Sequence, residues 1–131
     1  MINDINDIAI KFELKAAVVT VVENKIIRIS HHNDYEIQPE DIEELIGLFK
    51  DLRKKDLVER ILMVGASHTS ITPEARKIAE SNVFDAKGEA IVVRTLPQRI
   101  IANFYYMVKR KSYPVKVFNA EEGAIKWLNK L

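Results

Sequence analysis

One apolar run in the middle of the chain sets the fold class. Residues 61–64 (ILMV) are continuously apolar, which is typical of a strand covered on both faces of a parallel or mixed sheet. A glycine and an alanine then end the strand, and a hydroxyl-rich loop follows. Thr72 and Pro73 are residue types that suit an N-cap and a first helical position. Residues 58–76 therefore predict a buried strand, a loop and a helix start.

The rest of the chain alternates between strand and helix patterns. β-rich runs over residues 12–23 and 25–31 meet at Asn24, which tolerates a left-handed turn, so they predict a hairpin. The remaining patterns predict helices over 39–55, 73–82, 97–110 and the residues after 119, and strands over 61–64, 90–94 and 114–118. The order ββαβαβαβα indicates a single α/β domain over residues 1–131. Its expected core is a mixed five-stranded sheet with right-handed crossovers, flanked by helices.

Two of these helices have clear end signals. In the helix from Pro39, acids occupy the first turns and bases the last, an order that opposes the helix dipole. Its apolar residues recur at i, i+3 and i+4 and predict the core side: Ile42, Leu45, Ile46, Phe49 and Leu52. For the terminal helix, we expect a capping box formed by Asn119 and Glu122.

Composition excludes several classes of protein. The 131-residue chain has no cysteine, so disulfides, thiolate metal sites and a cysteine nucleophile are excluded. A net charge of +1 gives no general attraction to nucleic acid. The first residues lack the basic start and apolar centre of a signal peptide, and no stretch approaches the roughly 18 apolar residues of a membrane span. We therefore expect a cytoplasmic protein with no membrane span and no nucleic-acid partner.

The loop after the central strand is the first candidate site, because ligands of open α/β sheets bind at the carboxyl ends of strands. It contains four hydroxyl residues: Ser67, Thr69, Ser70 and Thr72. The helix start behind them offers free backbone N–H groups to a phosphate or a carboxylate. Helix capping without any ligand is the plainer interpretation of the same residues.

Motifs for catalysis and for metal binding are absent. Residues 65–69 lack the second glycine of a hydrolase nucleophile elbow, so a small serine hydrolase is only a third hypothesis. His31 and His32 are adjacent on a strand and point to opposite faces, so they can hardly share a metal ion. We expect a surface histidine pair, no metal, no cofactor and no enzymatic activity.

A second candidate site lies on the third expected helix. That helix carries more apolar surface than one core-facing stripe can hide, above all at Phe104, Tyr105, Tyr106 and Met107. Exposed patches of this kind mark contacts, so we expect either a small apolar ligand or a homodimer face here. Ordinary core packing is the alternative.

Three stretches of the second half resemble a known family. They are residues 72–76 (TPEAR), residues 99–104, and residues 114–118 (PVKVF) followed by Glu122, Ala124, Trp127 and Leu128. The chain resembles the small stand-alone bacterial STAS-like domains related to anti-sigma-factor antagonists. The resemblance implies a mixed sheet flanked by helices, a fold similar also to the lipid-binding CRAL-TRIO domains. It further implies a non-catalytic binding or regulatory module that acts through a protein partner or a small apolar ligand.

The resemblance also implies an alternative function. Antagonists of this type are switched by phosphorylation of a serine that follows an aspartate at the start of the second helix. The Asp-Ser pair is absent here, although Ser67 and Ser70 lie in the corresponding neighbourhood. A phosphorylation-controlled antagonist that uses Ser67 or Ser70 is therefore the second hypothesis.

Overall fold

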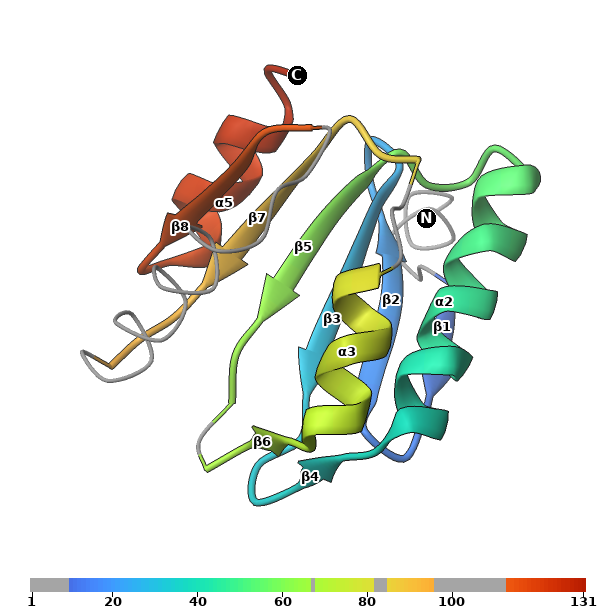
Figure 1. Cartoon of the computed structure of the whole chain (residues 1–131). Coiled ribbons are helices and arrows are strands. Elements are labelled where there is room, and N and C mark those ends of the chain that lie inside the picture. Colours follow the sequence, from blue (N-terminus) through green and yellow to red (C-terminus); the bar gives the residue numbers. More distant parts are fainter. Residues whose placement is uncertain (1–9, 67, 82–84, 96–112) are drawn as a thin grey trace.

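A mixed sheet forms the centre of the protein in a computed structural model that describes residues 10–66, 68–81, 85–95 and 113–131 (Figure 1). The sheet has six strands in the order β1-β2-β3-β5-β7-β8. They are β1 (Lys11–Glu13), β2 (Ala17–Val22), β3 (Ile26–His31), β5 (Arg60–Val64), β7 (Gly88–Val92) and β8 (Val115–Phe118). β1 pairs with β2, and β2 with β3, in the antiparallel direction, whereas β3, β5, β7 and β8 pair with one another in parallel.

Three described helices cover the two faces of the sheet (Figure 1). α2 (Pro39–Lys54) and α3 (Pro73–Ser81) lie on one face, and α5 (Glu121–Leu128) lies on the other. A separate two-stranded parallel sheet pairs β4 (Glu36–Ile37) with β6 (Ser70–Ile71), so it links the two segments that lead into α2 and α3. The mixed α/β fold expected from the sequence is therefore confirmed.

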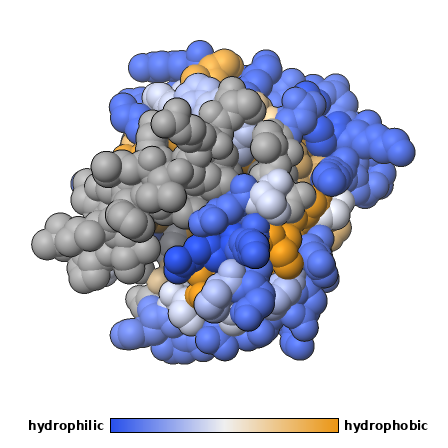
Figure 2. Space-filling model, viewed as in Figure 1, coloured by the Kyte–Doolittle hydropathy of each residue, from blue (hydrophilic) through white to orange (hydrophobic). Residues whose placement is uncertain are grey.

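The sheet separates two apolar cores. On the first face, Phe49 and Leu52 of α2 pack against strand residues that include Ile27, Ile29 and Ile61. On the second face, α5 packs on β5 and β7 through a cluster of Ile26, Leu62, Val64, Ala90, Val92, Ala124 and Leu128. The apolar run of β5 thus contributes to both cores, which explains why it lacks the alternation of a one-sided strand. Figure 2 shows hydrophilic residues over most of the described surface in this view, with apolar residues in narrow strips.

The sheet has one strand more than expected, because residues 12–23 form two strands. The N–H of Leu14 donates to the carbonyl of Ala17 at 2.9 Å, and this tight turn folds β1 back onto β2. Phe12 then pairs with Val19. The turn contains no glycine, proline or asparagine, so the sequence carries no turn signal at this point.

Two of the three predicted helix-end signals are confirmed, the first being the acids in the first turn of α2 and the bases in its last turn. The N–H of Ala75 donates to the Thr72 hydroxyl at 3.1 Å, so Thr72 caps α3 as expected. The predicted capping box of Asn119 and Glu122 is wrong, because α5 begins after Ala120 and has no side-chain cap.

An ion pair takes the place of that cap at the start of α5. The carboxylate of Glu121 accepts two hydrogen bonds from Arg28 of β3, each 2.8 Å long, and Arg94 lies 3.4 Å away. The hydrogen bond from Arg28 holds the pKa of Glu121 below its usual range. The helix start is therefore anchored to the middle of the sheet rather than to its own first turn.

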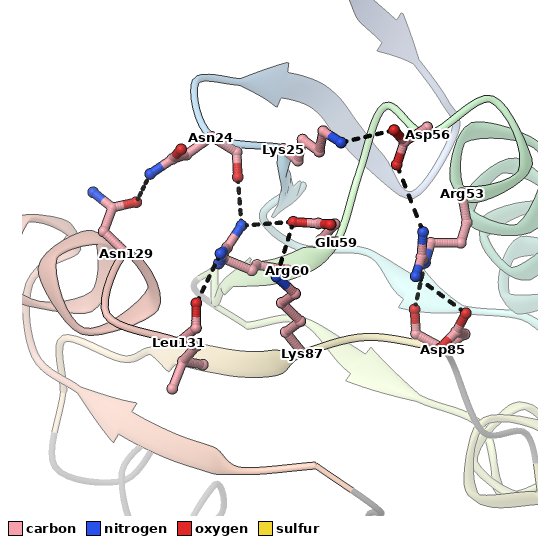
Figure 3. A network of polar contacts seen from close by, with 10 residues as sticks. All are labelled: Asn24, Lys25, Arg53, Asp56, Glu59, Arg60, Asp85, Lys87, Asn129 and Leu131. Carbon is pink, nitrogen blue, oxygen red and sulfur yellow. Dashed lines mark hydrogen bonds and ion pairs between the residues drawn. The ribbon is translucent and has the colours of Figure 1, made fainter.

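A polar network ties together the amino ends of the parallel strands (Figure 3). The buried guanidinium of Arg60 donates to the carbonyl oxygens of Asn24 and Leu131, both at 2.8 Å. Glu59 lies 3.1 Å from Arg60 and 3.5 Å from Lys87. The network joins the β2–β3 turn, the starts of β5 and β7, and Leu131 in the segment after α5, so it holds the end of the α5 layer against the sheet.

Truncation of the buried leucines tests the two-core arrangement. Leu62 and Leu128 are both fully buried, so Leu62→Ala and Leu128→Ala should each lower the free energy of unfolding by about 2–5 kcal/mol. Ile10→Ala is the control, because Ile10 is 44% exposed, and it should change the unfolding free energy by less than about 0.5 kcal/mol. Urea unfolding measures all three. A loss below about 1 kcal/mol at Leu62 would contradict its place in the core.

Two glycine substitutions should change the free energy of unfolding in opposite directions. A Cβ at Gly88 would collide with Cδ1 of Leu131, the end of a flexible side chain, so Gly88→Ala should turn that side chain aside and lower the free energy of unfolding by about 1 kcal/mol or less. A Cβ at Gly47 in α2 would have nothing within 4 Å, so Gly47→Ala should stabilise the helix by about 0.5–1 kcal/mol. Thermal unfolding compares them. Equal shifts in both variants would show that Leu131 is not held against β7.

Candidate functional site

The hydroxyl loop after β5 is fastened to the segment after β3. The Thr69 hydroxyl donates to the carbonyl of His32 at 2.6 Å. The N–H of Ser70 donates to the carbonyl of Tyr35 at 3.0 Å, and that of Thr72 to the carbonyl of Ile37 at 3.1 Å. Together with the β4–β6 pairing, these hydrogen bonds join the segment before α2 to the segment before α3. We call residues 32–37 and 68–74 together the carboxyl-edge surface.

The structure gives the candidate hydroxyls different roles. Those of Thr69 and Thr72 make the structural hydrogen bonds described above. Ser70 is exposed, and its hydroxyl has no hydrogen-bond partner within the described ranges. Ser67 lies outside the described residues. Plain capping thus accounts for Thr72, while Ser70 presents an exposed hydroxyl that has no partner among the described residues.

The order of the strands removes one argument for a ligand crevice at this edge. In open α/β sheets, the crevice forms where the strand order reverses. Here β3, β5, β7 and β8 follow one another across the sheet in chain order, so the order of the described strands does not reverse. The carboxyl ends of these strands therefore present an edge of loops without the crevice of a dinucleotide-binding fold.

The two adjacent histidines diverge as expected, but the prediction of a surface pair is wrong for His31. Its Nε2 lies 3.0 Å from Sδ of Met63 on β5, whereas Nε2 of His32 donates to the carbonyl of Leu14 at 3.2 Å. Burial and the neighbouring His32 lower the pKa of His31 to about 4. His31 faces inward because β3 alternates and places it on the same side as Ile29.

No arrangement for hydroxyl activation is present in the described residues. His31 and His32 make the contacts just given, and His68 pairs with Asp34 at 3.4 Å between two exposed side chains. None of these rings reaches a described serine or threonine hydroxyl, as base catalysis requires. The described residues also contain no group of three or more histidine or acidic side chains placed for a metal ion. No described helix has the length and apolar content to span a membrane.

The second candidate site lies outside the described residues. This applies to Phe104, Tyr105, Tyr106 and Met107, and to the whole helix expected over 97–110. The apolar ligand site and the homodimer face that the sequence suggested there stay predictions.

Comparison with known proteins identifies the family. Residues 20–131 match the family "Domain of unknown function (DUF7793)". The chain belongs to this family. No curated protein matches the chain. The DUF7793 match covers β3, β5 and both described sides of the carboxyl-edge surface.

A solved structure confirms the STAS-like fold of this DUF7793 protein. The chain is similar to an uncharacterized protein of the DUF3478 family with a SpoIIAA-like fold, from Shewanella loihica PV-4. The TM-score is 0.65 at 13% sequence identity, over 91% of this chain and 98% of the other. The similarity establishes the fold alone. The relation to CRAL-TRIO domains stays a prediction.

The buried histidine provides a test of this edge. Because the folded-state pKa of His31 lies near 4, below the ordinary 6.5, the unfolded chain takes up a proton first as the pH falls. The stability should therefore decline between about pH 6.5 and pH 4, by about 3 kcal/mol from this group. Urea unfolding of wild type, His31→Gln and the exposed control His68→Gln measures the decline. Identical pH profiles for wild type and His31→Gln would contradict the burial of His31.

Proposed function

We propose that this protein is a non-enzymatic STAS-like binding module that contacts a protein partner through the carboxyl-edge surface. The observation that carries the proposal is the fastening of residues 68–72 to residues 32–37 by the hydrogen bonds of Thr69, Ser70 and Thr72. A surface that is ordered before binding loses little conformational freedom when a partner docks. The absence of an activated hydroxyl among the described residues supports binding rather than catalysis.

The charge of the carboxyl-edge surface suggests the kind of partner. Asp34, Glu36 and Glu74 are exposed, and in the part of the chain that the structure describes none has a lysine or arginine partner. Glu40 at the start of α2 adjoins them and is also exposed. Acids at helix starts complement the helix dipole, but Asp34 and Glu36 precede α2 and do not serve that purpose. A partner that presents basic side chains complements this surface.

Regulation by phosphorylation is the second candidate function, and Ser70 supports it. Its hydroxyl is exposed and free of described partners, whereas those of Thr69 and Thr72 hold the loop together. A phosphate on Ser70 would add negative charge to an acidic surface, so it would change partner affinity without unpairing the loop. The Asp-Ser pair of the classical antagonists is absent from this chain, so the classical form of the switch does not carry over.

To identify the partner, a photo-crosslinking residue replaces His68 in one variant. The same residue replaces Lys126 in a second variant, which serves as a control distant from the surface. Both positions are exposed, and Lys126 lies on α5 on the opposite face of the sheet. One protein should be crosslinked in extracts of the source cells from His68 and not from Lys126. Equal crosslinking from both positions, or from Lys126 alone, would contradict the proposed surface.

The purified partner then separates the two functions. Charge reversal by Glu36→Lys should weaken binding by about tenfold and reduce its dependence on salt, while Glu80→Lys on the far end of α3 should not. Ser70→Asp should change the affinity with little effect on stability, and Ser70→Ala should resemble wild type. Unchanged partner affinity in Ser70→Asp would contradict regulation by phosphorylation at Ser70, but it would be compatible with an unregulated binding module. If the wild-type protein hydrolysed an activated ester, and Ser67→Ala or Ser70→Ala abolished that activity, both the binding module and the phosphorylation switch would be contradicted.

A further inference from the structure

The strand β1 forms one edge of the sheet, and its outer backbone groups are unpaired within the described ranges. It stands at the end of the strand order and pairs with β2 on one side (Figure 1). In line with that register, the carbonyl of Ile10 accepts a hydrogen bond from the N–H of Val21 at 2.8 Å. The backbone groups of an antiparallel strand point alternately toward and away from its neighbour. The N–H and C=O groups of Lys11 and Glu13 therefore point away from β2.

The charges on β1 make this edge complementary to itself. Lys11 and Glu13 lie on the same face of the strand, and both side chains are exposed. If two copies paired antiparallel about a two-fold axis at Phe12, Lys11 of each copy would lie opposite Glu13 of the other, and opposite charges so placed attract. The same register would bring the outward N–H and C=O groups of these residues together, so that each opposed pair exchanges two hydrogen bonds. The backbone and the charges thus favour one and the same register.

This register would also cover apolar surface. Ile10 is the one large apolar side chain that is exposed within the described ranges, and Phe12 is only partly buried where it packs against the core under α2. With the axis at Phe12, the two Phe12 rings would lie across the strand pair from each other, on the face of the sheet that α2 covers. Ile10 would lie opposite Leu14 of the second copy. Aromatic and apolar pairs placed directly across two strands stabilise a sheet.

We propose that β1 binds a second copy of this chain, so that the sheets of two copies join edge to edge by antiparallel pairing of β1 with β1. An edge strand that carries charges of one sign repels a second copy, whereas a lysine and a glutamate two residues apart attract one. The strand is only three residues long, so the dimer is weak and its population depends on protein concentration. This interface is distinct from the helix over 97–110, where the sequence suggested a homodimer face.

Sedimentation equilibrium of the full-length chain tests the proposal at protein concentrations from about 10 μM to about 1 mM, the range of weak interfaces. The wild type should pass from monomer toward dimer. Lys11→Glu and Glu13→Lys should each weaken association by about tenfold, because each substitution places like charges opposite one another on both sides of the axis. The variant that combines both substitutions should associate as the wild type does. An equimolar mixture of the two single variants should also associate, because each supplies the charge that the other lacks.

The matched control is Lys126→Glu, which reverses an exposed charge on α5 and should associate as the wild type does. A wild type that stays monomeric at every concentration would overturn the proposal and leave this edge to a partner of another sequence. Equal association of the wild type and both single variants would place the dimer interface elsewhere and overturn it as well. If the mixture of single variants stayed monomeric, Lys11 and Glu13 would not face each other across the interface, which would contradict the proposed register.

Discussion

The parallel pairing of β3 with β5 is the interaction on which the rest of the structure depends. Before it, the chain forms an antiparallel unit of β1, β2 and β3, and after it the sheet is parallel. The pairs of this register run from Ile26 with Arg60 to Ser30 with Val64, so the register determines which side chains lie close together at each end of the two strands. At one end it brings Arg60 to the carbonyl of Asn24, and at the other it brings His31 to Met63. Both the anchoring network around Arg60 and the contact of His31 with Met63 thus follow from one strand alignment.

The local features of the fold could be predicted from the sequence, because each depends on neighbouring residues. Thr72 caps α3 for the same reason that Thr before Pro starts helices generally, and the apolar spacing of α2 predicted its buried side. The break between β1 and β2 escaped prediction because the turn from Leu14 to Ala17 contains no glycine, proline or asparagine. The start of α5 escaped it because Arg28, which anchors Glu121, lies 93 residues away in the chain.

The candidate site was predictable only in part, for a related reason. The sequence placed four hydroxyls in one loop, but which of them are free depends on the segment against which the loop packs. The Thr69 hydroxyl is taken by His32, a residue from the other connection. Likewise, adjacent histidines on a strand must diverge, yet only the fold decides which of the two turns inward. Contacts between segments distant in the chain, rather than residue types, decide which hydroxyls are occupied by structural hydrogen bonds.

The two-residue pairing of β4 with β6 also has a mechanical consequence. α2 and α3 both begin directly after this short sheet, at Pro39 and Pro73, so neither helix start can lift from the sheet without straining the other. The first turns of the two helices and the bridge between them should therefore open as one cooperative unit. Force applied to either connection by a docked protein would then be shared by two helices that are separate in sequence, and would reach the α2–α3 contact through Ile37 and Ala75.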